Sequence, residues 1–217
     1  MIVFKNVSKR YPDGYVALNN VDLTVQAGEM LFLTGHSGAG KSTLLKLIAA
    51  LERPTSGTIS ISGQNIAQLK PAAIPYLRRK IGFVFQDHKL LFDRTAFENV
   101  LLPLQIANFE SKTVASRVRA ALDKVGLLKK EKSMPIALSG GERQRLCIAR
   151  AVVHRPSILI ADEPTGNLDV EYARDIMAMF TSFNQVGVTV LIATHDASLL
   201  EDTQHRILSL KQGKLAA

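Results

Sequence analysis

The chain has 217 residues, is 47% hydrophobic and carries a formal net charge of +8. This size allows one globular domain, of one or two lobes, that buries a core without disulfides or structural metals. The single cysteine, Cys147, excludes an internal disulfide framework, and we expect it to be a small buried residue of a helix.

Strands of two kinds are predicted. Residues 1–9, 21–25 and 58–63 alternate apolar and polar side chains, which favours half-exposed antiparallel strands. A second set is apolar on both faces, as in a parallel sheet that is covered by helices. These segments are residues 30–33, 158–161 and 188–193.

The middle of the chain has a different character. Residues 88–150 show helical spacing and few β-branched runs. We predict a helical lobe here, inserted into an α/β core lobe that consists of about residues 1–87 and 151–217. Together the two lobes make a single domain, residues 1–217.

A glycine-rich loop follows the apolar strand at 30–33 and precedes a helical run. It fits the pattern G-x-x-x-x-G-K-[ST], in which backbone N–H groups and a helix N-terminus hold phosphate oxygens. In such a loop the lysine, Lys41, reaches the β- and γ-phosphates of ATP, and the hydroxyl of Ser42 coordinates Mg²⁺. The expected nucleotide-binding residues are Gly35, His36, Ser37, Gly38, Ala39, Gly40, Lys41, Ser42 and Thr43.

Two acids and a histidine end two of the apolar strands. Asp162 closes the strand at 158–161 and is expected to support Mg²⁺. Glu163 follows it and is a candidate general base for an attacking water. His195 follows the strand at 188–193, where its side chain could contact a γ-phosphate. Glu163, His195 and Lys41 are the predicted catalytic residues.

A second anion-binding helix start lies in the helical lobe. Ser139, Gly140 and Gly141 offer a hydroxyl and free backbone N–H groups ahead of a helix. The stretch from Leu138 to Gln144 resembles the signature motif of ABC transporter nucleotide-binding subunits. The resemblance covers essentially the whole chain. It implies a P-loop NTPase core with a mixed sheet, an antiparallel β subdomain and an inserted helical subdomain.

The same resemblance implies roles for further residues. Tyr11 matches the aromatic residue that stacks on adenine, and Gln86 matches the glutamine that senses Mg²⁺ and the γ-phosphate. Gln86, Ser42 and Asp162 together are implied to hold the metal. Residues 166–169 match the D-loop, with Asn167 in place of the commoner alanine.

The resemblance also implies an ATP-dependent homodimer in which two chains lie head to tail. Each ATP then sits between the Lys41 loop of one chain and Ser139, Gly140 and Gly141 of the other.

Within the family, residues 33–47 and 86–95 are similar to bacterial cell-division ATPases. That resemblance implies an integral membrane partner and a peripheral position on the cytoplasmic face of the inner membrane, at the division site. It also implies a relay of ATP-driven movement toward cell-wall hydrolases. We expect the coupling surface near residues 86–108. The candidate contact residues, which could equally pack the helical lobe, are Leu90, Leu91 and Phe92.

Other features bear on the partner. No segment resembles a signal peptide, and no apolar run approaches the roughly 20 residues that span a bilayer. Basic clusters at residues 78–80 and 129–130 come without a nucleic-acid-reading motif, which favours solvated surfaces. We therefore expect a protein of the cytoplasm with no specific nucleic-acid partner.

Three alternatives remain on this evidence. The chain could drive lipoprotein release or macrolide export, because ATPases of those transporters share its motifs. It could act on DNA or the ribosome, although such proteins usually carry coiled-coil arms or two cassettes. It could also be a nucleotide sensor without turnover, although such a sensor would not need Glu163.

Overall fold

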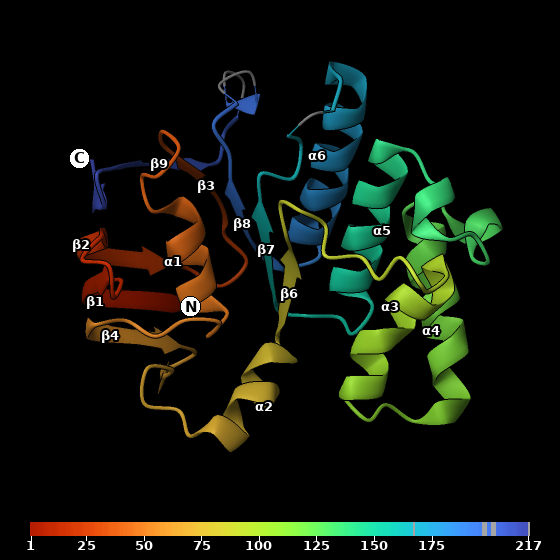
Figure 1. Ribbon diagram of the computed structural model, residues 1–217, viewed down its shortest axis with the longest axis horizontal. Helices are drawn as coiled ribbons and strands as arrows, with labels where there is room; N and C mark the ends of the chain where they lie inside the picture. Colours follow the sequence, from red (N-terminus) through yellow and green to blue (C-terminus); the bar gives the residue numbers. More distant parts are fainter. Residues whose placement is uncertain (167, 197–198, 201–202, 217) are drawn as a thin grey trace.

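The computed structural model describes residues 1–166, 168–196, 199–200 and 203–216. Its larger sheet has six strands in the order β10-β9-β3-β8-β7-β6 (Figure 1). From β9 to β6 the neighbouring strands run parallel, as predicted for the apolar segments, and β10 is antiparallel to β9. The strands are β3 (Met30–Thr34), β6 (Ile81–Val84), β7 (Ile158–Asp162), β8 (Thr189–Ala193), β9 (Arg206–Lys211) and β10 (Lys214–Leu215).

A smaller antiparallel sheet, in the order β2-β1-β4-β5, contains the alternating segments. The strand predicted over residues 58–63 ends earlier, at Ile61. The reason is that Ser62 and Gly63 both adopt a positive φ, of 49° and 81°, and so make a hairpin turn to β5. The strands are β1 (Ile2–Arg10), β2 (Val16–Val25), β4 (Ser56–Ile61) and β5 (Gln64–Asn65).

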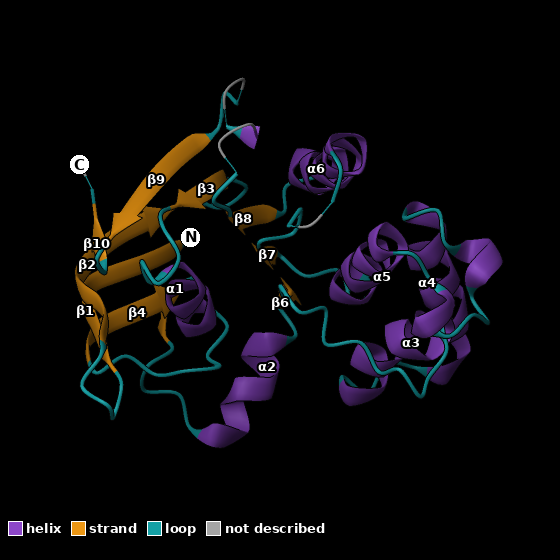
Figure 2. Cartoon of the chain, turned by 45° about the horizontal axis from the view of Figure 1, so that its top comes forward, coloured by secondary structure: helices purple, strands orange, loops and turns teal. Residues whose placement is uncertain are grey.

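The helices fall into three groups. Helix α1 (Lys41–Ile48) lies between the two sheets, and α2 (Ile74–Arg78) precedes β6. Figure 2 shows the predicted helical lobe to one side of the sheets, with α6 beside the larger sheet, and α5 of the lobe packs against β6. The lobe contains α3 (Ala96–Ile106), α4 (Ser111–Lys124) and α5 (Gly140–Val152), and α6 is Val170–Gln185. In the described part of the chain, no helix is both long and apolar enough to cross a bilayer.

Each buried strand contributes side chains to two hydrophobic cores. Side chains alternate between the faces of a strand, so in β7 Ile160 joins the core around α1 while Leu159 joins the core under the helices. In β3, Leu31 and Phe32 divide in the same way. This explains why these segments read as apolar throughout: both faces of the larger sheet are covered.

Short 3₁₀ segments complete the lobes, at Pro71–Ala73, Leu128–Lys130 and Pro135–Ala137. Helix α3 begins with a capping box, in which Thr95 accepts from the Glu98 N–H and the Glu98 carboxylate accepts from the Thr95 N–H. Such a cap contributes about 1 kcal/mol to helix stability and fixes where α3 starts.

Cys147 is buried in α5, as expected, and its thiol donates to the carbonyl of His88. Burial raises the pKa of the Cys147 thiol to about 12. We expect Ellman's reagent at pH 8 to react with native Cys147 about 10³-fold more slowly than with the unfolded chain. The reagent cannot reach the buried thiol, and little of the thiol is in the reactive thiolate form. Protein in guanidinium chloride is the control. Rapid labelling of the native protein would contradict the burial of this residue.

Candidate functional site: a phosphate cleft at the carboxyl edge of the parallel sheet

Four neighbouring strands end at one edge of the larger sheet. The glycine-rich loop follows β3, Gln86 lies beyond β6, Asp162 ends β7 and His195 lies beyond β8. Ligands bind at the carboxyl ends of such strands because the loops there leave a crevice. A cleft of about 740 Å³ opens at this edge, lined by the whole loop from Gly35 to Thr43 together with Gln86, Glu163 and His195.

The loop packs so closely that glycine is required. A Cβ on Gly35 would lie 2.2 Å from the Leu210 carbonyl oxygen, and one on Gly40 would lie 2.3 Å from that of Ala17. Gly40 also has a φ of 107° and caps α1, which begins at Lys41. The first N–H groups of α1 are therefore without helical partners, at the end of a helix that favours anions.

Lys41 lies within the cleft, with a side chain that is 8% exposed. Its ammonium group donates to the Gly35 carbonyl at 2.7 Å and lies 3.5 Å from a carboxylate oxygen of Glu163. Burying an unpaired cation costs free energy, and here a carbonyl group of the loop itself accepts a hydrogen bond from the ammonium group. The loop lysine and the predicted base are thus direct neighbours.

Glu163 is held from two sides. Its second carboxylate oxygen lies 2.8 Å from Nδ1 of His195 and accepts the backbone N–H of the same residue at 3.2 Å. The backbone of Glu163 has a φ of 51°, a conformation that costs a non-glycine residue about 1–3 kcal/mol and is concentrated at functional sites. The three predicted catalytic residues therefore form one connected group, Lys41–Glu163–His195.

Asp162 is buried at the end of β7, and its Oδ1 has no hydrogen-bond partner among the described residues. Burial raises the pKa of its carboxyl, and a hydrogen bond with Ser42 opposes this rise. An unpaired carboxylate oxygen beside a hydroxyl is a donor set that suits a hard cation such as Mg²⁺. The residues present fit the expected metal.

Two tyrosines, Tyr11 and Tyr15, lie next to each other near the loop. The Tyr11 hydroxyl donates to Glu52 at 2.8 Å and lies 3.2 Å from the Thr43 hydroxyl, and its ring stacks on that of Tyr15. Tyr15 lines the cleft, and its hydroxyl donates to the Gly38 carbonyl. Stacking of adenine on Tyr11 stays a prediction.

Sequence reasoning missed Tyr15, although a second aromatic residue four positions after Tyr11 was an available signal. It also missed Thr34, Ser209 and Lys211, which line the cleft. Ser209 and Lys211 lie on β9, whose place beside β3 is decided by tertiary pairing, so the sequence carries no local signal for them.

The structure does not bring the signature residues into this cleft. Ser139 is exposed at the start of α5, where its hydroxyl oxygen accepts the N–H of Glu142. The Glu142 carboxylate accepts the Ser139 N–H in return, which completes a capping box. Gly140 and Gly141 follow in the first turn of α5, where backbone N–H groups have no partner within the helix, and Gly141 is buried.

Of the predicted D-loop, Asn167 lies outside the described residues. Asp169 caps α6, because its carboxylate accepts the N–H of Tyr172 at 3.0 Å. A ring carbon of Tyr172 would lie 2.9 Å from a Cβ built on Gly141, so the start of α6 packs against the start of α5. The D-loop and the signature are therefore close neighbours in one chain.

Comparison with known proteins agrees with this geometry. Residues 18–166 match the family described as "ABC transporter", and the chain belongs to the ABC transporter family. It is 57% identical to the cell division ATP-binding protein FtsE of Escherichia coli, over 99% of this chain and 97% of that protein. The protein of the same name from Bacillus subtilis is 43% identical, with 98% and 93% covered.

Solved structures show the same architecture. A dimeric, post-hydrolysis state of the ATP-binding cassette MJ0796 bound to ADP and Pi has a TM-score of 0.92 at 37% identity, over 100% of this chain and 97% of that one. CbiO1 of Clostridium perfringens has a TM-score of 0.87 at 29% identity, with 100% and 86% covered. The predicted fold class and the predicted class of enzyme, an ABC-type ATPase, are confirmed.

Replacing Lys41 by Ala removes the cation that faces the phosphates. We expect ATP affinity to fall by about 10- to 100-fold or more, because charge-assisted hydrogen bonds are lost in a buried site. Titration calorimetry measures the affinity, and Lys5→Ala, an exposed lysine on β1, is the control. Unchanged affinity of the Lys41 variant would contradict the assignment of the loop.

Proposed function

We propose that this ABC-type ATPase is the nucleotide-hydrolysing subunit of a bacterial cell-division complex, with the integral membrane protein FtsX as its partner. One observation carries the proposal: the connected group Lys41–Glu163–His195 lies in the cleft of a chain that is 57% identical to FtsE over 99% of its length. In this role the chain lies peripherally on the cytoplasmic face of the inner membrane, at the division site. It regulates peptidoglycan hydrolysis at the septum through FtsX.

The residues of the cleft divide the chemistry between them. The N–H groups of the loop and the ammonium of Lys41 bind phosphate oxygens and neutralise charge that develops on the γ-phosphate. Glu163 accepts a proton from the water that attacks the γ-phosphorus, while the bond to the bridging oxygen of ADP breaks. His195 positions Glu163 through its 2.8 Å contact. Products are ADP and phosphate.

Asp162, Ser42 and Gln86 would hold Mg²⁺ at the same edge. When bound, this cation would supply neutralisation of the negative charge of the phosphates. The unpaired Oδ1 of Asp162 and the Ser42 hydroxyl support the assignment, and Gln86 lines the cleft from the end of the neighbouring strand.

The active unit in this proposal is an ATP-dependent homodimer of head-to-tail chains. Ser139, Gly140 and Gly141 do not line their own cleft, and they lie at the N-terminal end of α5, where Ser139 is exposed. A second chain related by a two-fold axis would use these residues on the γ-phosphate held by Lys41 of the first. Closure by ATP and release after hydrolysis then make a bistable device that can move a partner.

Replacing Glu163 by Gln tests the catalytic step. We expect hydrolysis to fall by about 10²–10⁴-fold, because an amide cannot accept the proton, while ATP affinity is retained. The variant should also accumulate as a closed dimer with ATP in size-exclusion chromatography. Asp175→Asn, an exposed acid on α6, is the control. Normal turnover by the Glu163 variant would refute the base assignment.

The residues of the expected coupling surface differ in their exposure to solvent. Leu90 is buried and packs the core of the helical lobe, whereas Phe92 is 53% exposed. A groove of about 470 Å³ lies between α2, β6, α3 and α5, and Phe85, which directly precedes Gln86, lines it. The groove also contains Ile106, which is 68% exposed. The apolar face of an amphipathic helix of the membrane partner fits such a groove.

The partner assignment is tested by affinity purification of the tagged chain from its own membranes. We expect an FtsX-type protein to be recovered with the native chain and to be lost with Ile106→Asp, because a charge in the groove opposes docking. Ile207→Asp, at an exposed position on β9, is the control. Recovery of a lipoprotein-releasing or efflux permease would keep the ATPase and overturn the cell-division role.

A further inference from the structure

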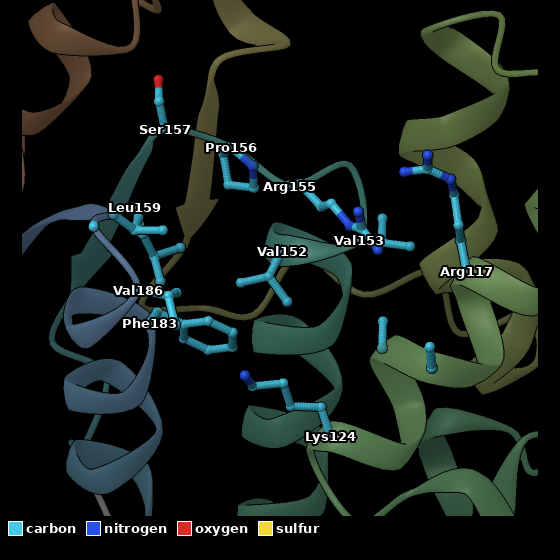
Figure 3. Close-up of a pocket in the computed structure, with 14 residues that line it drawn as sticks. Arg117, Lys124, Val152, Val153, Arg155, Pro156, Ser157, Leu159, Phe183 and Val186 are labelled. Atoms are coloured by element: carbon cyan, nitrogen blue, oxygen red, sulfur yellow. The ribbon is translucent and has the colours of Figure 1, made fainter.

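A further cavity lies between the helical lobe and α6 (Figure 3). It is distinct from the phosphate cleft and from the groove proposed for the membrane partner. Its volume is about 550 Å³, within the range of roughly 300–1,000 Å³ that is usual for small-ligand sites. The floor is apolar and comes from the end of α5, from β7 and from α6. The floor residues are Val152, Val153, Leu159 and Phe183.

The polar lining of this cavity is dominated by cations. Arg117 and Lys124 come from α4, and Arg155 comes from the segment between α5 and β7. No aspartate or glutamate lines the cavity, and among the described residues none of the three cations has a carboxylate within ion-pair distance. Positive charge is therefore uncompensated around an apolar floor.

Aromatic rings hold two of these cations. The Lys124 ammonium lies 4.8 Å from the centroid of the Phe183 ring, and Figure 3 shows it directed toward that ring. The guanidinium of Arg117 lies 5.0 Å from the centroid of the Phe109 ring. Such contacts orient a cation but leave its hydrogen-bond donors for another partner.

Arg155 occupies a backbone position that usually takes glycine. It follows the end of α5 with a φ of 55°, and its N–H donates to the Val152 carbonyl at 2.8 Å. The matching positions after α4 and α6 are Gly126 and Gly187, with φ values of 71° and 90°. A non-glycine residue here costs about 1 kcal/mol or more. This position places the arginine side chain in the lining of the cavity.

We propose that this cavity binds a small anionic amphiphile, that is, a carboxylate or phosphate group carried on an apolar chain or ring. The head group pairs with the cations, which would otherwise remain without a counter-charge, and the apolar part covers Val152 and Phe183. The volume fits one small molecule. An acidic helix of a partner would need a longer groove.

The site spans both lobes. Its walls combine α4 and α5 of the helical lobe with β7 and α6 of the core lobe. A ligand that contacts all four elements binds the folded chain and not the unfolded one. It therefore raises the melting temperature, by an amount that grows with the logarithm of its concentration above the dissociation constant.

Sodium decanoate is a suitable probe, in calorimetry and thermal-shift assays below its micellar concentration. We expect one site per chain, with binding at least about 10-fold weaker for decanol and for decylammonium, which share the chain but lack the negative charge. Lys124→Gln and Arg155→Gln should each weaken decanoate binding by about 10-fold, whereas Lys129→Gln, outside the cavity, should not.

A variant with a larger side chain in the cavity tests whether decanoate binds there or at another apolar surface. Ala120 lines the cavity at an exposed position of α4, so Ala120→Phe should fill it without disturbing the core, and Ala115→Phe on the same helix is the control. Loss of decanoate binding in the Ala120 variant alone supports the proposal. Equal binding by both variants, or decanol binding as tightly as decanoate, overturns it.

Cosedimentation with phosphatidylglycerol vesicles distinguishes the source of the ligand. Sedimentation that is lost in Ala120→Phe but kept in Ala115→Phe identifies a bilayer lipid. Decanoate binding without sedimentation identifies a free amphiphile. Binding of an acidic peptide of the partner that requires Arg155, with no binding of decanoate, would overturn the amphiphile assignment.

Discussion

The register of four parallel strands is the constraint on which the nucleotide site depends. Ala161 pairs with Ile192 and Asp162 with Ala193, while Leu33 pairs with Ala193 from the other side. A slip of one residue would turn each strand over and exchange the side chains of the two cores. Because both faces are buried, such a slip is strongly opposed, and Lys41, Glu163 and His195 are brought together as a consequence.

Helix α5 links the functional regions of the chain. Its first turn contains the capping box at the signature residues. Its last turn lies between the groove proposed for the membrane partner and the cavity lined by Arg117, Lys124 and Arg155. Near that end the Arg150 guanidinium donates to the carbonyls of His88 and Lys89, which follow Gln86. The segment that begins at Gln86 is thus tied to α5, so a movement of either can be transmitted to the groove.

Local patterns predicted much of the site because each element carried its own signal. The loop from Gly35 to Thr43 has a fixed spacing, and the acids that end β7 follow an unbroken apolar run. Leu90 had no such signal, and Tyr15 had only its place four residues after Tyr11. Whether an apolar residue packs inward or faces a partner, and which tyrosine reaches the cleft, depends on segments that are remote in sequence.

The sequence by itself determined the motifs, the two kinds of strand and the family, because these depend on residue type and on spacing within short segments. Tertiary structure alone decided that β9 contributes to the cleft and that three cations gather around an apolar cavity. Those features arise from pairing and packing between distant segments, where loop closure and shared burial, rather than local preference, select the arrangement.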